Sequence, residues 1–412
     1  MTETVQPKPT IPRPVRLLLF AFFLTGFATV AQITILGKQM FDMTGRELDL
    51  GLLGLAEFLP LAVLAPFTGS LADRVDRRKV FAWGLLGEIG VSLCLFGYVA
   101  QAPTRVAPIF VLVVVYGMCR AVASPAARSL PIDLATPDLL ERITALRSVA
   151  YQAGVISGPI AAGFLFVVHP AAPYLLAAVA YSVGLLLLRG LPRPPTRKLA
   201  TSGGVQALRD AREGLRFIRR QPVVFGAISL DLFAVLFGGV VALLPAICEK
   251  RLGVGAVGLG GLRAAIGAGA TLAAVVLSWR PLRQRVGPSL LGVVALFGVM
   301  TIVIGLTRNY VVAFLAFTVA SAGDAVSVFI RSTLVPLATP EEMRGRVLAV
   351  ENVFIGASNE LGAVESGITA AAFGLVGAVL FGGVGTLVVV GFWLRFFPDL
   401  RRVNRFSDVR AG

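Results

Sequence analysis

The chain has 412 residues, of which 56% are hydrophobic and only 15% are charged, and its mean hydropathy is +0.82. An ordinary soluble domain is about half apolar and about a quarter charged, so this composition excludes a chain of soluble domains and predicts a membrane protein. A net charge of +15 would point to nucleic acid in a soluble protein, so the positions of the basic residues must decide between that partner and a membrane.

Long apolar segments follow one another along the whole chain. A bilayer core requires about 20 apolar residues per helical span, and twelve segments approach or meet this length. They lie near residues 15–36, 48–70, 79–100, 106–128, 143–167, 172–190, 222–247, 256–279, 287–306, 310–333, 346–371 and 374–395. We therefore predict an all-α membrane protein with 12 transmembrane helices.

The basic residues between these spans are unevenly distributed. If the N-terminus lies inside, most of the 38 Lys and Arg fall in cytoplasmic segments. The external segments hold Lys38, Arg46, Arg105, Lys250, Arg251 and Arg308. This bias follows the positive-inside rule and predicts a multi-pass protein of a bacterial plasma (inner) membrane with both termini cytoplasmic. The charge then reflects topology and contact with anionic membrane lipids, with no nucleic-acid partner.

The chain divides into two halves of six spans. A polar tail, residues 1–14, lacks the apolar core of a cleaved signal peptide. Residues 15–190 and 222–395 form the two predicted bundles, and residues 396–412 form a cytoplasmic tail. The basic, proline-rich linker 191–221 carries apolar and basic residues in the pattern of an amphipathic helix on the inner membrane surface. The alternative is a solvated linker.

A sequence repeat relates the two halves. The segments Arg128–Pro137 and Arg331–Pro340 match at an offset of 203 residues, and each follows an even-numbered span, four or ten. Parallel repeats of six helices are related by an axis along the membrane normal, and such transporters bind substrate near the midplane between the repeats. The repeat therefore predicts two pseudo-symmetric six-helix bundles.

A short run of charges joins the second and third spans. Its spacing, Gly-x-Leu-Ala-Asp-Arg-x-x-Arg-Arg-Lys, resembles the loop between helices 2 and 3 of the major facilitator superfamily. The resemblance implies an inner gate loop formed by Gly69, Asp73, Arg74, Arg77 and Arg78. The alternative is that the loop only fixes topology by its positive charge.

A glycine- and proline-containing motif lies in the fifth span. It consists of Gly154, Gly158, Pro159 and Gly163. Glycines at this spacing allow helices to approach closely, and the proline removes one helical hydrogen bond, so helix packing alone explains the motif. The pattern also resembles that of the proton-coupled exporters in the same superfamily, which implies export.

The resemblance extends over nearly the whole chain. The segments Pro340–Val347 and Phe354–Gly367 are similar to the enterobactin-exporter-like, drug-proton antiporter branch of the superfamily. This implies the major facilitator fold, in which spans 1, 4, 7 and 10 line a central cavity, and alternating access by rocking of the bundles. It does not imply one substrate, because the branch exports siderophores, macrolides and other drug-like compounds.

Ionisable residues within spans are costly in a bilayer and are therefore functional candidates. For proton coupling in the cavity we select Asp231, Asp324, Arg120, Glu57, Glu351 and Glu365. Asp231 lies about ten residues, or roughly 15 Å, into the seventh span, near the midplane, and Asp324 lies deep in the tenth. Asp231 and Asp324 are therefore the first choices for proton coupling.

Each remaining charged residue has an alternative role. Arg120 resembles a span-4 arginine associated with proton transfer, but it could also be a buried ion-pair partner of Glu57 or another carboxylate. Helical spacing places Glu351 and Glu365 on one stripe and Glu360 on the opposite side, so Glu360 is not selected. Glu88, on the third span, is expected to make a structural hydrogen bond.

Few residues could support catalysis or cofactor binding. The sole histidine, His169, lies in a short external turn, and the three cysteines lie singly on separate spans. No phosphate-binding Gly-x-x-x-x-Gly-Lys-Ser/Thr motif is present. We therefore expect neither an enzyme nor a metal site nor a cofactor.

The sequence thus predicts a secondary transporter that acts as a monomer and exports a small amphipathic molecule, siderophore or drug-like, in exchange for protons. An uptake carrier or a lysophospholipid or lipid-precursor transporter is one alternative. A membrane sensor or scaffold without transport activity is another, and whether Asp231 and Asp324 face an aqueous cavity distinguishes it from a transporter.

Overall fold

The computed structural model describes residues 11–134, 137–192 and 204–409, without the side chains of 65–67, 69–74, 132–134, 137, 138, 140, 141 and 204–208. Within those ranges every regular element is a helix. The N-terminal half contains α1 (Arg13–Thr44), α2 (Glu47–Arg74), α3 (Arg77–Val99), α4 (Ala107–Leu134), α5 (Pro137–Val168) and α6 (Ala172–Leu188). The helix α7 (Gly204–Arg220) precedes the C-terminal half.

The C-terminal half is less regular. It contains α8 (Pro222–Phe237), η1 (Gly239–Val241), α9 (Leu244–Ile247), η2 (Cys248–Leu252), α10 (Ala256–Trp279), α11 (Val286–Leu306), α12 (Tyr310–Leu337), α13 (Glu341–Phe396), α14 (Pro398–Arg402) and η3 (Phe406–Val409). The predicted seventh span, residues 222–247, is thus divided among α8, η1 and α9, and η2 follows it. The eleventh and twelfth are joined in α13, where Gly374 has a φ of 75° that interrupts the helix. A glycine adopts this left-handed conformation without steric cost.

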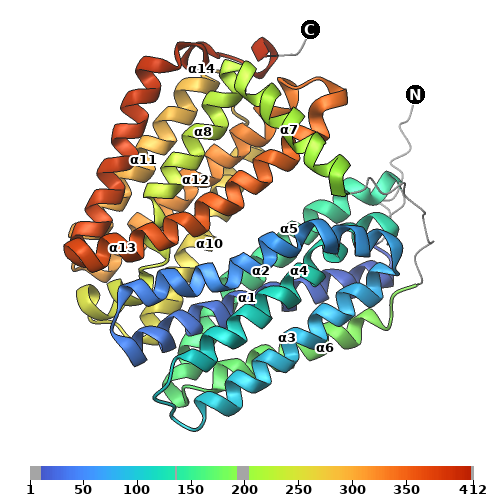
Figure 1. The fold of residues 1–412 in the computed structure, drawn as a ribbon, viewed down its shortest axis with the longest axis vertical. Helices are drawn as coiled ribbons and strands as arrows, with labels where there is room; N and C mark the ends of the chain where they lie inside the picture. Colours follow the sequence, from blue (N-terminus) through green and yellow to red (C-terminus); the bar gives the residue numbers. More distant parts are fainter. Residues whose placement is uncertain (1–10, 135–136, 193–203, 410–412) are drawn as a thin grey trace, which may run out of the picture.

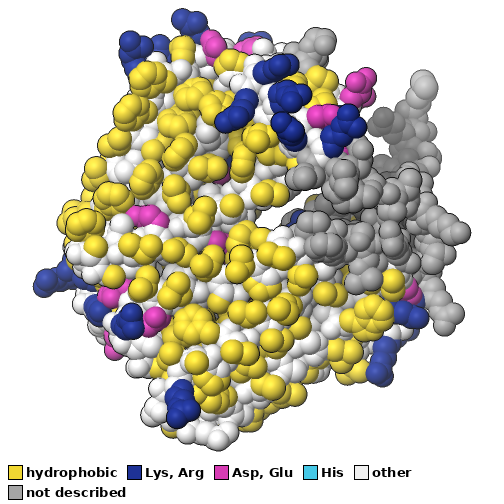
Figure 2. All heavy atoms as spheres, in the orientation of Figure 1, with side chains coloured by type: hydrophobic (Ala, Val, Ile, Leu, Met, Phe, Trp, Pro, Cys, Tyr) yellow, Lys and Arg dark blue, Asp and Glu magenta, His cyan; other side chains and the backbone are white. Residues whose placement is uncertain are grey.

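The helices have the length and composition of membrane spans. Nine helices of the described part are long and apolar enough to cross a bilayer. With α2, the shorter α6 and the part of α13 after Gly374, they make the twelve membrane helices that the sequence predicts. Figure 2 shows hydrophobic side chains over most of the visible face, with many Lys and Arg gathered at its ends. Such a surface suits contact with lipid rather than water.

The helices form two bundles, α1–α6 and α8–α14, which Figure 1 shows as a blue-green and a yellow-red group. The starts of α1 and α8, the α2–α3 turn, α7 and α14 mark one end of the molecule, here called the termini side. The opposite end, with η2 and the end of α1, is here called the far side. Between the bundles α2 packs against α13, and α5 packs against α10.

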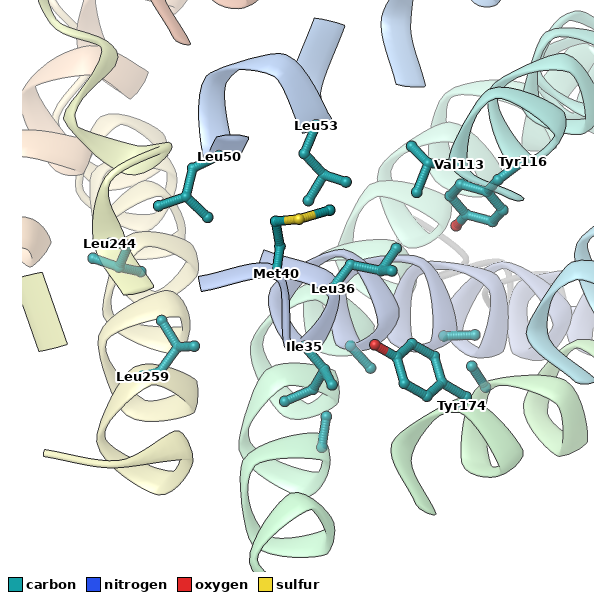
Figure 3. Close-up of a cluster of buried hydrophobic side chains, with 14 of the residues drawn as sticks. Ile35, Leu36, Met40, Leu50, Leu53, Val113, Tyr116, Tyr174, Leu244 and Leu259 are labelled. Carbon is teal, nitrogen blue, oxygen red and sulfur yellow. The ribbon is translucent and has the colours of Figure 1, made fainter. Parts of the chain in front are cut away.

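The far side is closed by an apolar junction. Figure 3 shows Met40 of α1 beside Leu50 and Leu53 of α2. Leu244 of α9 and Leu259 of α10 face them from the C-terminal half, and all five side chains belong to one buried cluster. A second buried cluster holds the C-terminal bundle together near the termini side. Among the residues whose side chains are described, the hydrophobic core that the bundles share lies at the far side.

Candidate functional site

A cavity of about 560 Å³ lies between the two bundles. Its lining comes from α1, α2 and α4 of one half and from α8, η1, α9, α10, α11, α12 and α13 of the other. Figure 2 shows the hollow between the bundles. Most lining residues are apolar, and the charged ones are Glu57, Arg120, Arg263, Asp324 and Glu360. Apolar walls with a few convergent polar groups are typical of small-molecule sites.

Glu57 of α2 and Arg120 of α4 form an ion pair in this cavity. Close approach of the two helices brings the pair together, because a Cβ at Gly117 would lie 2.1 Å from the Glu57 carbonyl oxygen. The Arg120 guanidinium also lies 5.9 Å from the ring centroid of Tyr116. The ion pair with Glu57 that was considered for Arg120 is thus present, and a part of Arg120 in proton transfer stays a prediction.

Three other charged side chains face the cavity without an ion pair among the residues whose side chains are described. Arg263 of α10 supplies one positive charge, and Asp324 of α12 and Glu360 of α13 supply two negative ones. The Asp324 side chain is exposed to solvent, although the residue lies near the middle of α12. The cavity therefore offers unpaired groups of both signs to a ligand.

A second charged cluster is buried in the C-terminal bundle. Arg331 of α12 lies 2.7 Å from Asp231 of α8 and 3.9 Å from Glu351 of α13. The three residues are 3%, 5% and 6% exposed. Two carboxylates thus share one guanidinium, so the neutral form of this cluster requires one proton. The Arg331 Nε atom and the hydroxyl of Ser327, one turn away, lack hydrogen-bond partners in the described part of the chain.

The structure brings the selected carboxylates together only in part. Asp324 and Glu57 line the cavity, whereas Asp231 and Glu351 lie in the Arg331 cluster. Glu365 is absent from the described cavity lining, and its carboxylate accepts a hydrogen bond from Ser366 at 3.5 Å.

The selection among the α13 carboxylates needs a correction. Glu360, which the sequence analysis set aside, lines the cavity, whereas Glu351 and Glu365 do not belong to its described lining. The sequence separates the two stripes of this helix correctly, but it cannot say which stripe faces the other bundle. Packing of α2 against α13 decides this, since a Cβ at Gly54 of α2 would lie 2.9 Å from the Glu360 carboxylate.

The turn between α2 and α3 is held by Asp76 and Arg78. Asp76 caps α3 by accepting a hydrogen bond from the Arg78 backbone N–H at 3.0 Å, and it accepts another from Arg78 Nη2 at 2.9 Å. Burial tends to raise the pKa of Asp76, but the hydrogen bonds and charge of Arg78 outweigh it and hold that pKa below its usual value.

Arg78 also links the turn to the end of the N-terminal bundle. Its Nη1 donates to the Leu191 carbonyl oxygen at 2.6 Å. The side chains of Gly69, Asp73 and Arg74 lie outside the described residues, and Arg77 is half-buried at the start of α3. The gate role of this loop remains a prediction.

The α5 motif lies at two helix contacts. A Cβ at Gly158 would lie 2.3 Å from the Phe27 carbonyl oxygen of α1, within the N-terminal bundle. A Cβ at Gly163 would lie 2.5 Å from the Ala256 carbonyl oxygen of α10, in the other bundle. Gly154 packs on α1 like Gly158, and the Pro159 carbonyl oxygen is close to Gly260 of α10. The motif therefore sets how closely α5 approaches both neighbours.

Ion pairs connect the two halves at the far side. Lys250 of η2 lies 2.6 Å from Glu47 of α2, and Lys38 of α1 lies 3.2 Å from Glu249 of η2. Lys38 is only 6% exposed and also pairs with Asp42 on its own helix. The sequence analysis treated these lysines only as topology markers. Lys38 lies just past the predicted first span, 15–36, and its burial depends on contacts with the other half that the sequence does not show.

Comparison with known proteins agrees with this architecture. Residues 18–363 match the family model described as Major Facilitator Superfamily. The chain therefore belongs to the major facilitator superfamily, whose members are membrane transporters rather than enzymes.

Individual relatives cover almost the whole chain. It is 27% identical over 398 residues to the enterobactin exporter EntS of Escherichia coli, with 93% of each chain covered. A bacterial homolog of the human lysosomal transporter Spinster, in an inward-facing and unoccupied conformation, superposes with a TM-score of 0.72 at 16% identity, covering 98% of this chain and 100% of that one. The nucleoside transporter NupG superposes with a TM-score of 0.76 at 13% identity, covering 93% and 100%.

Proposed function

We propose that this chain is a proton-coupled exporter of a small amphipathic molecule, working by alternating access of its two bundles. The observation that carries the proposal is the cavity between the halves, where unpaired charges of both signs lie among apolar walls. Similarity to an enterobactin exporter supports the direction of transport. The motif Gly154, Gly158, Pro159 and Gly163 supports it further, through its likeness to the motif of proton-coupled exporters.

Carboxylates in the cavity and in the Arg331 cluster support the coupling of transport to protons. Asp324 is exposed in the cavity, and Asp231 shares Arg331 with Glu351. A cluster with one more carboxylate than guanidinium is costly to bury in its fully ionised form. Uptake of a proton from the cavity would relieve this cost, and release would restore it, so the cluster suits a group that exchanges protons during a transport cycle.

The charges of the cavity limit the substrate class. Asp324 and Glu360 alone would favour a cation over an anionic catecholate. Because Arg120 and Arg263 also line the cavity, an anionic or amphoteric ligand finds a complementary group there as well. Both siderophores and drug-like molecules therefore remain within the proposal.

The positions of the basic residues also bear on how the protein is oriented in the membrane. The distribution of Lys and Arg supports an orientation with the termini side in the cytoplasm of a bacterium and the protein in the plasma (inner) membrane. The far-side ion pairs and apolar junction then close the external entrance in this structure. The proposed transporter acts as a monomer among anionic lipids.

Two alternatives have specific tests. A lipid transporter would need an opening from the membrane into the cavity, but the apolar groove of about 700 Å³ between α8 and α13 shares no described lining residue with it. An inactive sensor would not need a solvent-exposed carboxylate in the cavity, and Asp324 is one. Both observations favour export of a water-accessible ligand.

Proton flux in proteoliposomes under an imposed pH gradient tests the proposal. The parent protein would be screened with catecholate siderophores, beginning with enterobactin, and with lipophilic cations. We expect substrate-dependent proton movement that Asp231→Asn or Asp324→Asn abolishes. The control is Glu341→Gln, whose side chain is 91% exposed at the start of α13. Substrate movement without protons, or flux unaffected by both changes, would refute the coupling.

A further inference from the structure

A polar cluster is enclosed within the N-terminal bundle, away from the cavity. It contains Glu88 and Ser92 of α3 and Gln32 of α1, which are 2%, 0% and 0% exposed. The Ser92 hydroxyl lies 2.6 Å from Gln32 Oε1 and 2.7 Å from the Glu88 carbonyl oxygen. Polar groups that are buried so completely usually have their hydrogen bonds satisfied, so atoms of this cluster that lack partners need an explanation.

Two atoms of the cluster have no such partner. Within the described part of the chain, neither Glu88 Oε2 nor Gln32 Nε2 has a hydrogen-bond partner. Glu88 also forms no ion pair with any described side chain, unlike Glu57 in the cavity and Asp231 in the C-terminal bundle. A carboxylate without a cation in an apolar interior is far more costly than a neutral carboxylic acid. The enclosed position of Glu88 therefore favours the neutral carboxylic acid over the carboxylate.

Among the described residues, Arg120 of α4 is the cation beside Glu88. Helices α3 and α4 meet here, because a Cβ at Gly87 would lie against the Cys119 sulfur, but the Arg120 guanidinium is engaged by Glu57 of α2. The other polar side chains of this region, Tyr116 and Cys119 of α4 and Tyr181 of α6, are a thiol and two phenols, which carry no charge at neutral pH. From α1 the cluster receives only the uncharged Gln32.

The hydroxyl groups nearby form a closed chain of their own. Tyr116 and Tyr181 lie 2.8 Å apart, and Tyr181 lies 2.9 Å from Thr29 of α1. These groups stabilise each other and leave Glu88 dependent on Arg120 for any compensation of a negative charge. Two carboxylates, one facing the cavity and one enclosed, thus compete for a single guanidinium.

We propose that Glu88 is a proton-binding site inside the N-terminal bundle, and that Arg120 pairs in turn with Glu57 and Glu88. In the step, the O–H bond of the Glu88 carboxyl breaks and a new O–H bond forms on the Glu57 carboxylate. The charge moves from Glu57 to Glu88, and Arg120 follows it, so protons and charge balance without another reactant. The Glu57 carboxyl faces the cavity and can then release the proton there.

This site deepens the proton coupling proposed above, but its main test does not depend on transport. Infrared spectroscopy of the purified protein in lipid detects the C=O stretch of protonated carboxylic acids. We expect the parent protein at neutral pH to show a component of this band that Glu88→Gln removes. Glu57→Gln should remove the same component, because Arg120 would then have only Glu88 as a partner and would hold it ionised.

Controls separate this result from general disturbance. Glu341→Gln changes an exposed carboxylate and should leave the component unchanged. If Glu88→Gln does not fold, Glu88→Asp serves in its place and should shift the frequency of the component. A band that Glu88→Gln leaves intact, or a Glu88 component that persists in Glu57→Gln, would overturn the proposal.

Flux measurements provide a second readout that a purely structural role would not change. Folded Glu88→Gln should still move substrate down its own gradient, with fewer protons exchanged per substrate than the parent. An unchanged proton-to-substrate ratio would overturn the relay. If the parent shows no coupled flux at all, the exporter proposal fails, while the infrared result still decides whether Glu88 binds a proton.

Discussion

Lys250 of η2 lies 2.6 Å from Glu47 of α2, so the C-terminal half reaches across the far side and contacts the N-terminal half. In a second ion pair the lysine comes from the N-terminal half: Lys38 of α1 lies 3.2 Å from Glu249 of η2. Each half thus donates one lysine and one carboxylate, and the two contacts lie beside the apolar junction that closes this side. Alternating access requires both contacts to break when the far side opens.

Weakening these contacts should open the far side more often. Cys248 lies beside them and is fully buried, so its reaction with a thiol reagent reports opening. We expect Glu47→Gln to raise the labelling rate of Cys248. Since Lys250 is 45% exposed, the pair is worth about 1 kcal/mol at most, which limits the increase to roughly fivefold.

The labelling would be done with Cys94→Ser and Cys119→Ser in place, because neither of those cysteines is buried. Glu341→Gln is the matched control for loss of a carboxylate away from the far side. A labelling rate that stays at the parent value in Glu47→Gln would show that the pair does not hold the far side closed.

The Arg331 cluster should respond unequally to loss of its members. Arg331→Met leaves Asp231 and Glu351 buried without a cation, and breaking a buried pair in this way costs about 3–5 kcal/mol. Asp231→Asn leaves the guanidinium with Glu351 and should cost less. The unfolding temperatures of the two variants in detergent show which of them loses more stability.

A double variant provides the control for this cluster. Asp231→Leu combined with Arg331→Met leaves Glu351 as the one carboxylate of the cluster without a cation, whereas Arg331→Met alone leaves two, so the double variant should be the more stable. Equal unfolding temperatures for the single and double variants would contradict the view that an unpaired carboxylate is the source of the loss.

The sequence predicts the fold well because the membrane makes strong demands on composition. Twelve apolar segments, the basic bias and the repeat at Arg128 and Arg331 all depend on local residue types. The eleventh and twelfth predicted spans lie on either side of Gly374, where a φ of 75° breaks α13. The departure in the seventh span is also local: α8 ends at Phe237 and η1 begins at Gly239.

The site is less predictable because its geometry depends on contacts between distant helices. The pairing of Arg120 with Glu57 could be considered from their residue types alone. The cavity position of Glu360, however, depends on the rotation of α13 against α2, and the far-side pairs of Lys38 and Lys250 depend on how the bundles meet. A single sequence contains no direct signal for either.

The glycines of α5 should differ in what they control. Gly158→Ala would place a methyl group 2.3 Å from the Phe27 carbonyl oxygen and should lower the unfolding temperature of the protein. Gly163→Ala meets the other bundle, at Ala256, and should instead raise the labelling rate of Cys248 by separating α5 from α10. Thermal unfolding in detergent tests the first expectation, and the Cys248 labelling experiment tests the second.

Gly90→Ala is the matched control, because a Cβ at that position meets nothing within 4 Å. Alanine is favoured over glycine in a helix by about 1 kcal/mol, so this variant should be at least as stable as the parent. If Gly158→Ala were equally stable, the close approach of α5 to α1 would not depend on glycine.

The cap at Asp76 gives the α2–α3 turn a defined pH dependence. Because the pKa of Asp76 is lower in the folded protein than in the unfolded chain, its carboxylate stabilises the fold above the ordinary carboxyl pKa. That contribution is lost as the pH falls through the lowered value. Asp76→Ala should therefore cost about 0.5–2 kcal/mol at neutral pH, the usual range for an N-cap, and the difference from the parent should shrink in acid.

Asp76→Asn separates the two parts of this contribution. The amide oxygen can still cap α3 at the Arg78 N–H, but it carries no charge for the Arg78 guanidinium. We expect the stability of this variant at neutral pH to lie between those of the parent and Asp76→Ala, with a smaller acid dependence than the parent. Unfolding temperatures measured across pH for all three proteins test this order. A parent and an Asp76→Ala variant that lose stability in parallel as the pH falls would show that another carboxylate controls the acid response.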